Sequence, residues 1–159
     1  MKRNGKINVW TNPFVSFVFY QYLATSMLKV QTVLIVDDDD DDREMFCEAV
    51  NEISKAITCI HATDGLAALE LLSQQNNQVF DLIFLDLNMP GLNGKQCLAE
   101  IKKLDKVKDV PVIIYSTSNH VQDKEDTKRM GAANFLHKPT RFDALCNELQ
   151  GIFSTNFGS

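Results

Sequence analysis

The chain has 159 residues, of which 45% are hydrophobic and 23% charged, a balance typical of one globular domain with a buried core. The formal net charge of -5 comes from one local feature, the unbroken acid run Asp37 to Asp42, because the remaining charges nearly cancel. Lys and Arg do not form a basic stripe along the sequence, which argues against a nucleic-acid partner.

The first 26 residues differ from the rest. A basic start is followed by an apolar, aromatic-rich stretch that proline and several polar residues interrupt. These interruptions make it a poor membrane span, so we expect no membrane partner; a weak signal peptide cut before Met27 is the alternative. We expect residues 1–26 to be an N-terminal extension outside the fold, and residues 27–159 to form the domain.

From Thr32 onward, short apolar runs alternate with amphipathic stretches. The runs predict five strands, at residues 33–36, 57–61, 82–85, 110–115 and 134–137. The amphipathic stretches predict five helices, which include residues 41–55, 67–72, 96–104, 120–130 and 141–153. This alternation is typical of a doubly wound α/β domain with a parallel sheet. The fourth helix has only Val121 and Met130 as apolar residues, so we expect it to dock weakly.

Cys47, Cys59, Cys97 and Cys146 are widely spaced, with no Cys-x-x-Cys pair and no histidine at metal-ligand spacing. We therefore expect buried or half-buried thiols in a reducing compartment, with neither a disulfide nor a zinc site. The corresponding prediction for localisation is the cytoplasm.

Four of the predicted strands are followed by polar residues. They are Asp37 and Asp38 after the first strand, Asp86 after the third, Ser116 after the fourth and Lys138 after the fifth. The carboxyl ends of parallel strands form one edge of an open sheet, where ligands bind. Carboxylates without His or Cys suit Mg²⁺. A lysine and a hydroxyl beside them suit phosphoryl transfer to an aspartate nucleophile.

The acid run divides into two parts. Asp37 and Asp38 directly follow the first strand, which favours a place in this site. Asp40 and Asp42 come later, and we interpret them as solvated acids at the start of the first helix, where the helix dipole favours negative charge.

These segments together resemble the receiver domain of bacterial-type response regulators, the two-component signalling family, over residues 30–155. The matching segments are Val36 to Asp39, Phe84 to Gly94, Pro111 to Ser116, Gly131 to Phe135, and Lys138-Pro139. The resemblance implies a five-stranded parallel sheet of flavodoxin-like order 2-1-3-4-5 with five helices. It also implies a stand-alone receiver that is not an enzyme beyond its own phosphorylation and dephosphorylation, and that signals by contact with a downstream protein.

The resemblance also implies roles for individual residues. Asp86 is expected to accept a phosphoryl group from a histidine kinase or histidine phosphotransfer protein. Lys138 is expected to pair with that group, with a cis peptide bond before Pro139. The ligands implied for Mg²⁺ are Asp37, Asp38, Asp86 and the backbone carbonyl of Asn88.

Ser116 and Phe135 form the implied switch. Ser116, in place of the more usual Thr, keeps a hydroxyl that can donate to the phosphoryl group. Phe135 replaces a frequent Tyr, so a signal through a phenolic hydroxyl is absent. Thr117 stands where a smaller residue is common, and we expect it to narrow access to the phosphoryl group.

Two other classes of protein remain open. A phosphohydrolase of the haloacid-dehalogenase type also uses a strand-end aspartate with Mg²⁺ and lysine, but it needs a second acid two residues on, where this chain has Asn88. Turnover of a phosphomonoester would identify it. The other class is a pseudo-receiver that binds partners without phosphorylation, against which the intact acids, Ser116 and Lys138 argue.

Overall fold

A computed structural model describes residues 30–74 and 77–155 of the chain, so the predicted extension, residues 1–26, lies outside the described residues. The described part consists of five strands that alternate with five helices. The strands are β1 (Thr32–Val36), β2 (Thr58–Ala62), β3 (Leu82–Leu85), β4 (Val112–Ser116) and β5 (Asn134–His137). The helices are α2 (Asp40–Ile53), α3 (Gly65–Ser73), α4 (Gly94–Ile101), α5 (Val121–Arg129) and α6 (Phe142–Phe153).

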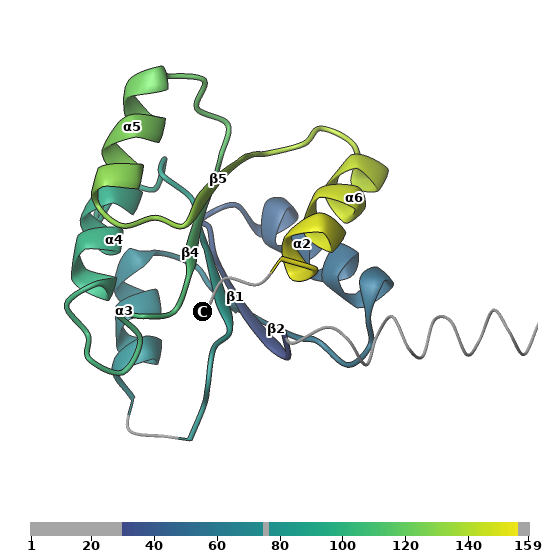
Figure 1. Ribbon diagram of the computed structural model, residues 1–159, viewed down its shortest axis with the longest axis horizontal. Helices are drawn as coiled ribbons and strands as arrows, with labels where there is room; N and C mark the ends of the chain where they lie inside the picture. Colours follow the sequence, from purple (N-terminus) through teal and green to yellow (C-terminus); the bar gives the residue numbers. More distant parts are fainter. Residues whose placement is uncertain (1–29, 75–76, 156–159) are drawn as a thin grey trace, which may run out of the picture.

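All five strands are parallel and form one sheet in the order β2-β1-β3-β4-β5. Helices α2 and α6 cover one face of this sheet, and α3, α4 and α5 cover the other (Figure 1). The predicted fold class and strand order are therefore confirmed. The ends of the predicted elements shift by a few residues; α4, for example, ends at Ile101 rather than at residue 104.

The apolar runs of the central strands fill both layers of the core. Val33 and Ile35 of β1 belong to the cluster beneath α2 and α6, whereas Leu34 and Val36 belong to the cluster on the opposite face. All four are fully buried. Successive side chains of a strand point to opposite faces, so a strand covered on both sides must be apolar throughout. This is why the central strands lack a polar alternation.

Helix α5 is attached to its neighbour by charges rather than by an apolar face. Its one buried residue is Thr127, and Val121 is 71% exposed, so the expectation that Val121 helps to hold the helix is wrong. Instead, the Lys95 ammonium of α4 donates to Asp123 at 2.8 Å and to Asp126 at 2.9 Å. These contacts lower the pKa of both carboxyls and raise the pKa of Lys95, so all three groups are charged at neutral pH.

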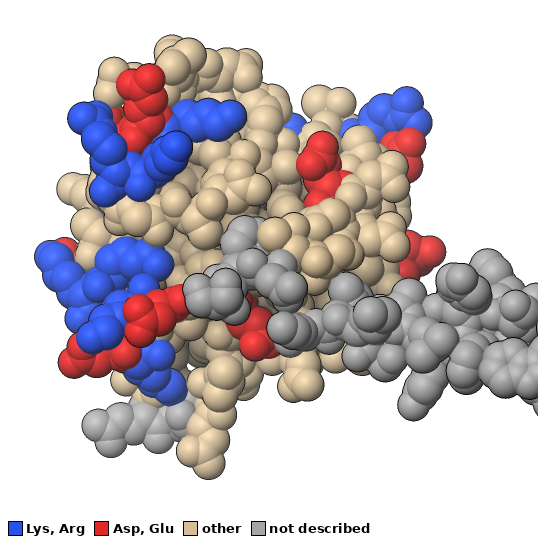
Figure 2. Space-filling view, viewed as in Figure 1, with Lys and Arg blue, Asp and Glu red and all other residues tan. Residues whose placement is uncertain are grey.

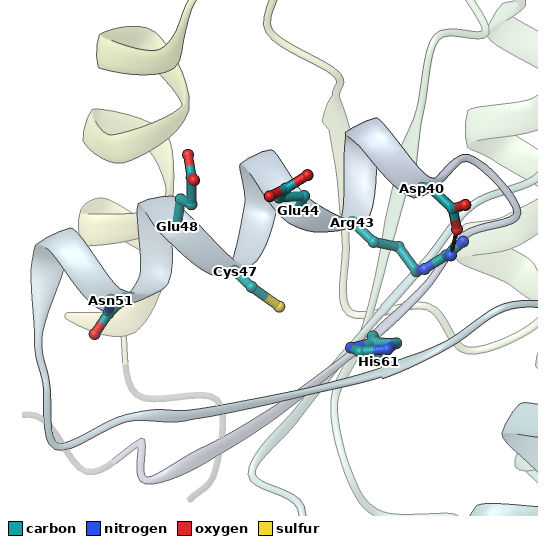
Figure 3. Close-up of a pocket in the computed structure, with 7 residues that line it drawn as sticks. All are labelled: Asp40, Arg43, Glu44, Cys47, Glu48, Asn51 and His61. Atoms are coloured by element: carbon teal, nitrogen blue, oxygen red, sulfur yellow. Dashed lines mark ion pairs between the residues drawn. The ribbon is translucent and has the colours of Figure 1, made fainter.

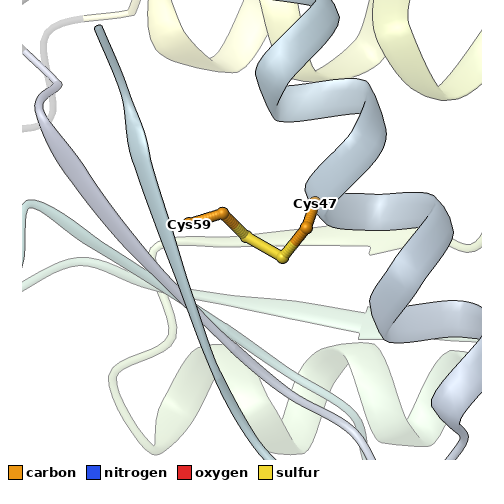
Figure 4. Close-up of a disulfide and its surroundings, with 2 residues drawn as sticks. All are labelled: Cys47 and Cys59. Carbon is orange, nitrogen blue, oxygen red and sulfur yellow. A yellow bond between two sulfur atoms is a disulfide. The ribbon is translucent and has the colours of Figure 1, made fainter. Parts of the chain in front are cut away.

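A disulfide joins Cys47 of α2 to Cys59 of β2, with Cα atoms 5.6 Å apart (Figure 4). The prediction that the chain has no disulfide is therefore wrong for this pair. The two cysteines are separated by 12 positions, but α2 runs back across the sheet and brings them within bonding distance. Cys97 is buried and Cys146 half-buried, and both are free thiols, as expected.

The surface over α4 and α5 carries many Lys and Arg side chains with acids among them (Figure 2). Several cations pair with an acid three positions away, which neutralises part of this charge locally. These pairs are Lys103 with Glu100, Lys108 with Asp105, and Arg129 with Asp126. Within the described residues, no helix is long and apolar enough to cross a membrane.

Candidate functional site at the carboxyl edge of the sheet

The register of the sheet brings the predicted site residues to one edge. Val36 of β1 lies opposite Leu85 of β3, so Asp37 and Asp86 leave neighbouring strands together. A backbone hydrogen bond of 2.9 Å from the Asp86 N–H to the Val36 carbonyl fixes this alignment. On the other side, the Lys138 N–H donates to the Ser116 carbonyl at 3.0 Å. The parallel ladder therefore sets the spacing of the side chains that follow it.

Three carboxylates form a cluster that can hold a divalent cation. Asp37, Asp38 and Asp86 each offer one oxygen, and these oxygens all lie within 4.8 Å of one another. Asp37 is fully buried and Asp86 is 4% exposed, whereas Asp38 is open to solvent. Such hard oxygen donors with one side open to water suit Mg²⁺ or Mn²⁺. The fourth expected ligand, the carbonyl of Asn88, belongs to an exposed residue two positions after Asp86.

The Lys138 ammonium lies inside this acidic group, with its side chain 10% exposed. It is 2.7 Å from Asp37 Oδ2 and 3.7 Å from Asp86 Oδ2. Burial by itself lowers the pKa of Lys138, but the surrounding carboxylates outweigh burial and raise the pKa above its ordinary value. Burial also raises the pKa of Asp37, although its contact with Lys138 opposes this shift. Lys138 is therefore a cation at neutral pH, held close to the predicted phosphoacceptor.

Asp42 also contacts Lys138, which the sequence interpretation did not foresee. Its Oδ2 atom lies 2.6 Å from the Lys138 ammonium, the shortest of the three distances to a carboxylate. The interpretation of Asp42 as a purely solvated acid is therefore wrong, whereas Asp40, whose side chain is 89% exposed, is solvated as expected. No signal in the sequence pointed to this contact, because Asp42 and Lys138 are 96 positions apart.

The aromatic ring of Tyr115 lies against the Lys138 ammonium. The ammonium lies 5.4 Å from the centre of the Tyr115 ring, a separation at which a cation is attracted to an aromatic face. Tyr115 packs edge-on against Phe46 at 5.4 Å, and Phe46 packs against Phe84 at 4.7 Å. The Tyr115 hydroxyl is buried and makes no hydrogen bond within the described part of the chain. Tyr115 thus contributes its ring to the site.

Ser116 is fully buried, and its oxygen accepts two hydrogen bonds. The Asn88 side-chain amide donates to Ser116 Oγ at 3.4 Å, and the Ser118 N–H donates to it at 3.2 Å. Neither contact uses the proton of the Ser116 hydroxyl, which donates to no acceptor among the described residues. Ser118 in turn donates to Asp123 at 2.5 Å, so the loop after β4 is linked to α5.

The loop after β3 requires a glycine where it meets α4. A Cβ atom at Gly94 would lie 2.1 Å from the Asp86 carbonyl oxygen and 2.6 Å from the Leu87 Cα atom. The neighbouring Asn93 caps α4, since its side chain accepts from the Gln96 N–H and the Gln96 side chain accepts from the Asn93 N–H. Gly94 therefore lets the start of α4 pack directly on the backbone of Asp86.

The second predicted switch residue, Phe135, is half-buried on β5 and lines a cavity of about 270 Å³ between α5 and β5. Thr117 is exposed beside Ser116. The peptide bond before Pro139 is trans, so the expected cis bond is not found.

A larger cavity of about 460 Å³ lies between α2 and β2 and contains neither Asp86 nor Lys138. Figure 3 shows Glu44, Cys47 and Glu48 on the helix and His61 on the strand. The rim also contains Arg43, which is paired with Asp40. This cavity gives solvent access to Cys47, and it is separate from the acidic cluster.

Comparisons with known proteins agree with this geometry. The family model of the response regulator receiver domain matches residues 33–150. The response regulator Rcp1 of Synechocystis sp. is 33% identical over 132 residues, which cover 78% of this chain and 87% of Rcp1.

Two solved structures have the same fold. That of the phosphorylated cyanobacterial phytochrome response regulator RcpA is 28% identical, with a TM-score of 0.71, and the match covers 77% of this chain and 91% of RcpA. That of the Mn²⁺-bound form of Rcp1 is 32% identical, with a TM-score of 0.68 and coverage of 78% and 92%. The chain therefore belongs to the response regulator receiver domain family of two-component signalling proteins.

Proposed function

We propose that this receiver domain is a phosphoacceptor, phosphorylated on Asp86 by a histidine kinase or histidine phosphotransfer protein in a Mg²⁺-dependent reaction. The observation that carries the proposal is the convergence of Asp37, Asp38 and Lys138 on the Asp86 carboxylate. The solved structures of phosphorylated RcpA and of Mn²⁺-bound Rcp1 support it by similarity.

In this reaction an Asp86 carboxylate oxygen attacks the phosphorus atom of a phosphohistidine. The bond from phosphorus to the imidazole nitrogen breaks, its electron pair stays on that nitrogen, and an aspartyl phosphate forms. Lys138 and the Ser116 hydroxyl donate to the phosphoryl oxygens. When bound, Mg²⁺ supplies positive charge that offsets the charge of these oxygens. The proposed ligands of the ion are Asp37, Asp38, Asp86 and the carbonyl of Asn88.

Intact mass spectrometry tests this function on the full chain. With Mg²⁺ and acetyl phosphate as a small phosphodonor, we expect the mass of the protein to rise by one phosphoryl group. Without a divalent cation, in excess chelator, we expect no increase, because the acidic cluster repels the donor. No gain of mass with Mg²⁺, or turnover of a phosphomonoester with no covalent adduct, would refute the proposed function.

We further propose that phosphorylation changes the surface formed by α5, β5 and α6, where a downstream protein binds. When Ser116 donates to the phosphoryl group, Ser118 must move with it, and this movement reaches α5 through Asp123. Phe135 lies beside the cavity next to α5 and is placed to swing inward. By linkage, a partner that binds this surface should favour phosphorylation.

Hydrogen exchange with and without beryllofluoride, a phosphoryl mimic, measures this switch. We expect changed protection within residues 116–137 and little change in α2 beyond the acid run, because the contacts of Ser116 lead toward α5. Changed protection only in the loop after Asp86, with unchanged protection in residues 116–137, would contradict the proposed switch.

The extent of the domain is also a proposal. We propose that residues 27–159 fold without residues 1–26. A protein that begins at Met27 should melt within a few degrees of the full chain and accept phosphate equally well, because every proposed site residue lies after residue 36. A much lower melting temperature would mean that the first 26 residues pack on the domain.

A further inference from the structure

The Lys138 ammonium is held most closely by a residue outside the expected phosphorylation machinery. Its distances are 2.6 Å to Asp42, 2.7 Å to Asp37 and 3.7 Å to Asp86. At 3.7 Å the contact with Asp86 is too long for a hydrogen bond, whereas the contact with Asp42 is a charge-assisted hydrogen bond and the contact with Asp37 is a close ion pair. In this state of the protein, Lys138 is therefore bound to Asp42 of α2 and paired with Asp37 just after β1, and it is only near to Asp86.

The position of Asp42 is set by the start of α2. The Asp39 side chain caps the helix and accepts from the backbone N–H groups of Asp41 and Asp42, at 2.9 and 3.2 Å. Asp42 is thus fixed in the first turn, where the helix dipole stabilises its negative charge. Its side chain is 32% exposed, whereas that of Lys138 is 10% exposed. The carboxylate can therefore return to water when Lys138 leaves, but the ammonium needs another partner.

A phosphoryl group on Asp86 would be that partner. It adds about two negative charges and three acceptor oxygens beside an ammonium that has only three protons to donate. The ammonium proton that Lys138 now donates to Asp42 would then be donated to a phosphoryl oxygen. Asp37 cannot be released as easily, because it is fully buried.

We propose that Asp42 is a positioning residue: it holds Lys138 in the unphosphorylated protein and releases it to the phosphoryl group on Asp86. The proposal rests on the proposed function of Asp86. Its consequence is that the Asp42 contact stabilises only the unphosphorylated state, so it weakens the binding of a phosphoryl group. An Asp at this position would thereby lower the fraction of phosphorylated protein at a given supply of phosphodonor.

Beryllofluoride binding at saturating Mg²⁺ tests the proposal. Asp42→Asn keeps the size of the side chain but removes its charge, and we expect the variant to bind beryllofluoride about threefold to fivefold more tightly than wild type, the range for a partly exposed ion pair. Asp42→Glu keeps the charge and should stay within about twofold of wild type. Asp41→Asn is the matched control, since it removes one charge from the same helical turn at an exposed side chain.

A second measurement separates positioning from a general effect of charge. The ¹⁵N chemical shift of the Lys138 ammonium reports its hydrogen-bond partners. In wild type this shift should change strongly on beryllofluoride addition, because the Lys138 ammonium then donates to fluorine instead of to the Asp42 carboxylate. In Asp42→Asn the starting shift should already differ from wild type, and in Asp41→Asn it should not.

The outcomes distinguish this inference from the proposed function. Tighter binding in Asp42→Asn alone, with a changed Lys138 shift, supports the inference. Equal or weaker binding in Asp42→Asn, or the same gain in Asp41→Asn, overturns it while the proposed function stands. Failure of wild type to bind beryllofluoride at all refutes the proposed function, and the inference with it.

Discussion

An Asp86→Asn variant is expected to take up no phosphoryl group under conditions in which the wild-type chain takes up one. The amide that replaces the carboxylate is not a nucleophile, and it also removes one oxygen ligand from the acidic cluster. Asp37 does not replace it, because its carboxylate is fully buried and already accepts from the Asp39 N–H and pairs with Lys138. Intact mass after treatment with Mg²⁺ and acetyl phosphate measures the result.

The control for this experiment is Asp41→Asn, which removes an acid from the same edge of the molecule but leaves Asp86 in place. It should gain one phosphoryl group, as wild type does. The Asp86→Asn variant should stay folded, because removal of one carboxylate from a cluster of three relieves repulsion, and a melting curve checks this. A phosphoryl adduct of the same size in a folded Asp86→Asn protein would mean that the phosphoacceptor is another residue.

Loss of the disulfide between Cys47 and Cys59 should have the largest effect on stability. The bond closes a short loop, since the two residues are 12 positions apart, and loops of this size correspond to about 3 kcal/mol of free energy of unfolding. For a domain of this size that corresponds to a fall in melting temperature of about 10 °C. We therefore expect the double variant Cys47→Ala, Cys59→Ala to melt about 10 °C below oxidised wild type.

Addition of dithiothreitol to wild type should lower the melting temperature by a similar amount. The reductant can reach Cys47, because this residue lines the open cavity between α2 and β2 (Figure 3). Cys146→Ser is the matched control, since it removes a half-buried free thiol and leaves the disulfide intact. Non-reducing peptide mapping must find the linked peptides. Unchanged melting after confirmed reduction would show that the bond adds no stability.

The sequence by itself determined the architecture and the edge at which the site forms. The apolar run from Leu82 to Leu85 predicts a strand covered on both faces, and the polar residues after four of the runs predict one cluster at the carboxyl edge. These inferences succeed because each depends on local information: the period of the apolar residues, the turn residues and the parallel direction of the strands. Asp37, Asp86 and Lys138 meet as a consequence of that topology.

The tertiary structure alone decided which side chains touch. Asp42 and Lys138 are 96 positions apart, and Cys47 meets Cys59 only because α2 crosses back over β2. Val121, one of the two apolar residues expected to give α5 a weak apolar contact, is exposed, and Lys95 of α4 pairs with two acids of the helix instead. The physical reason is that composition and spacing define which face of an element is apolar, whereas the contacts between two elements depend on how far each is shifted and rotated against the other.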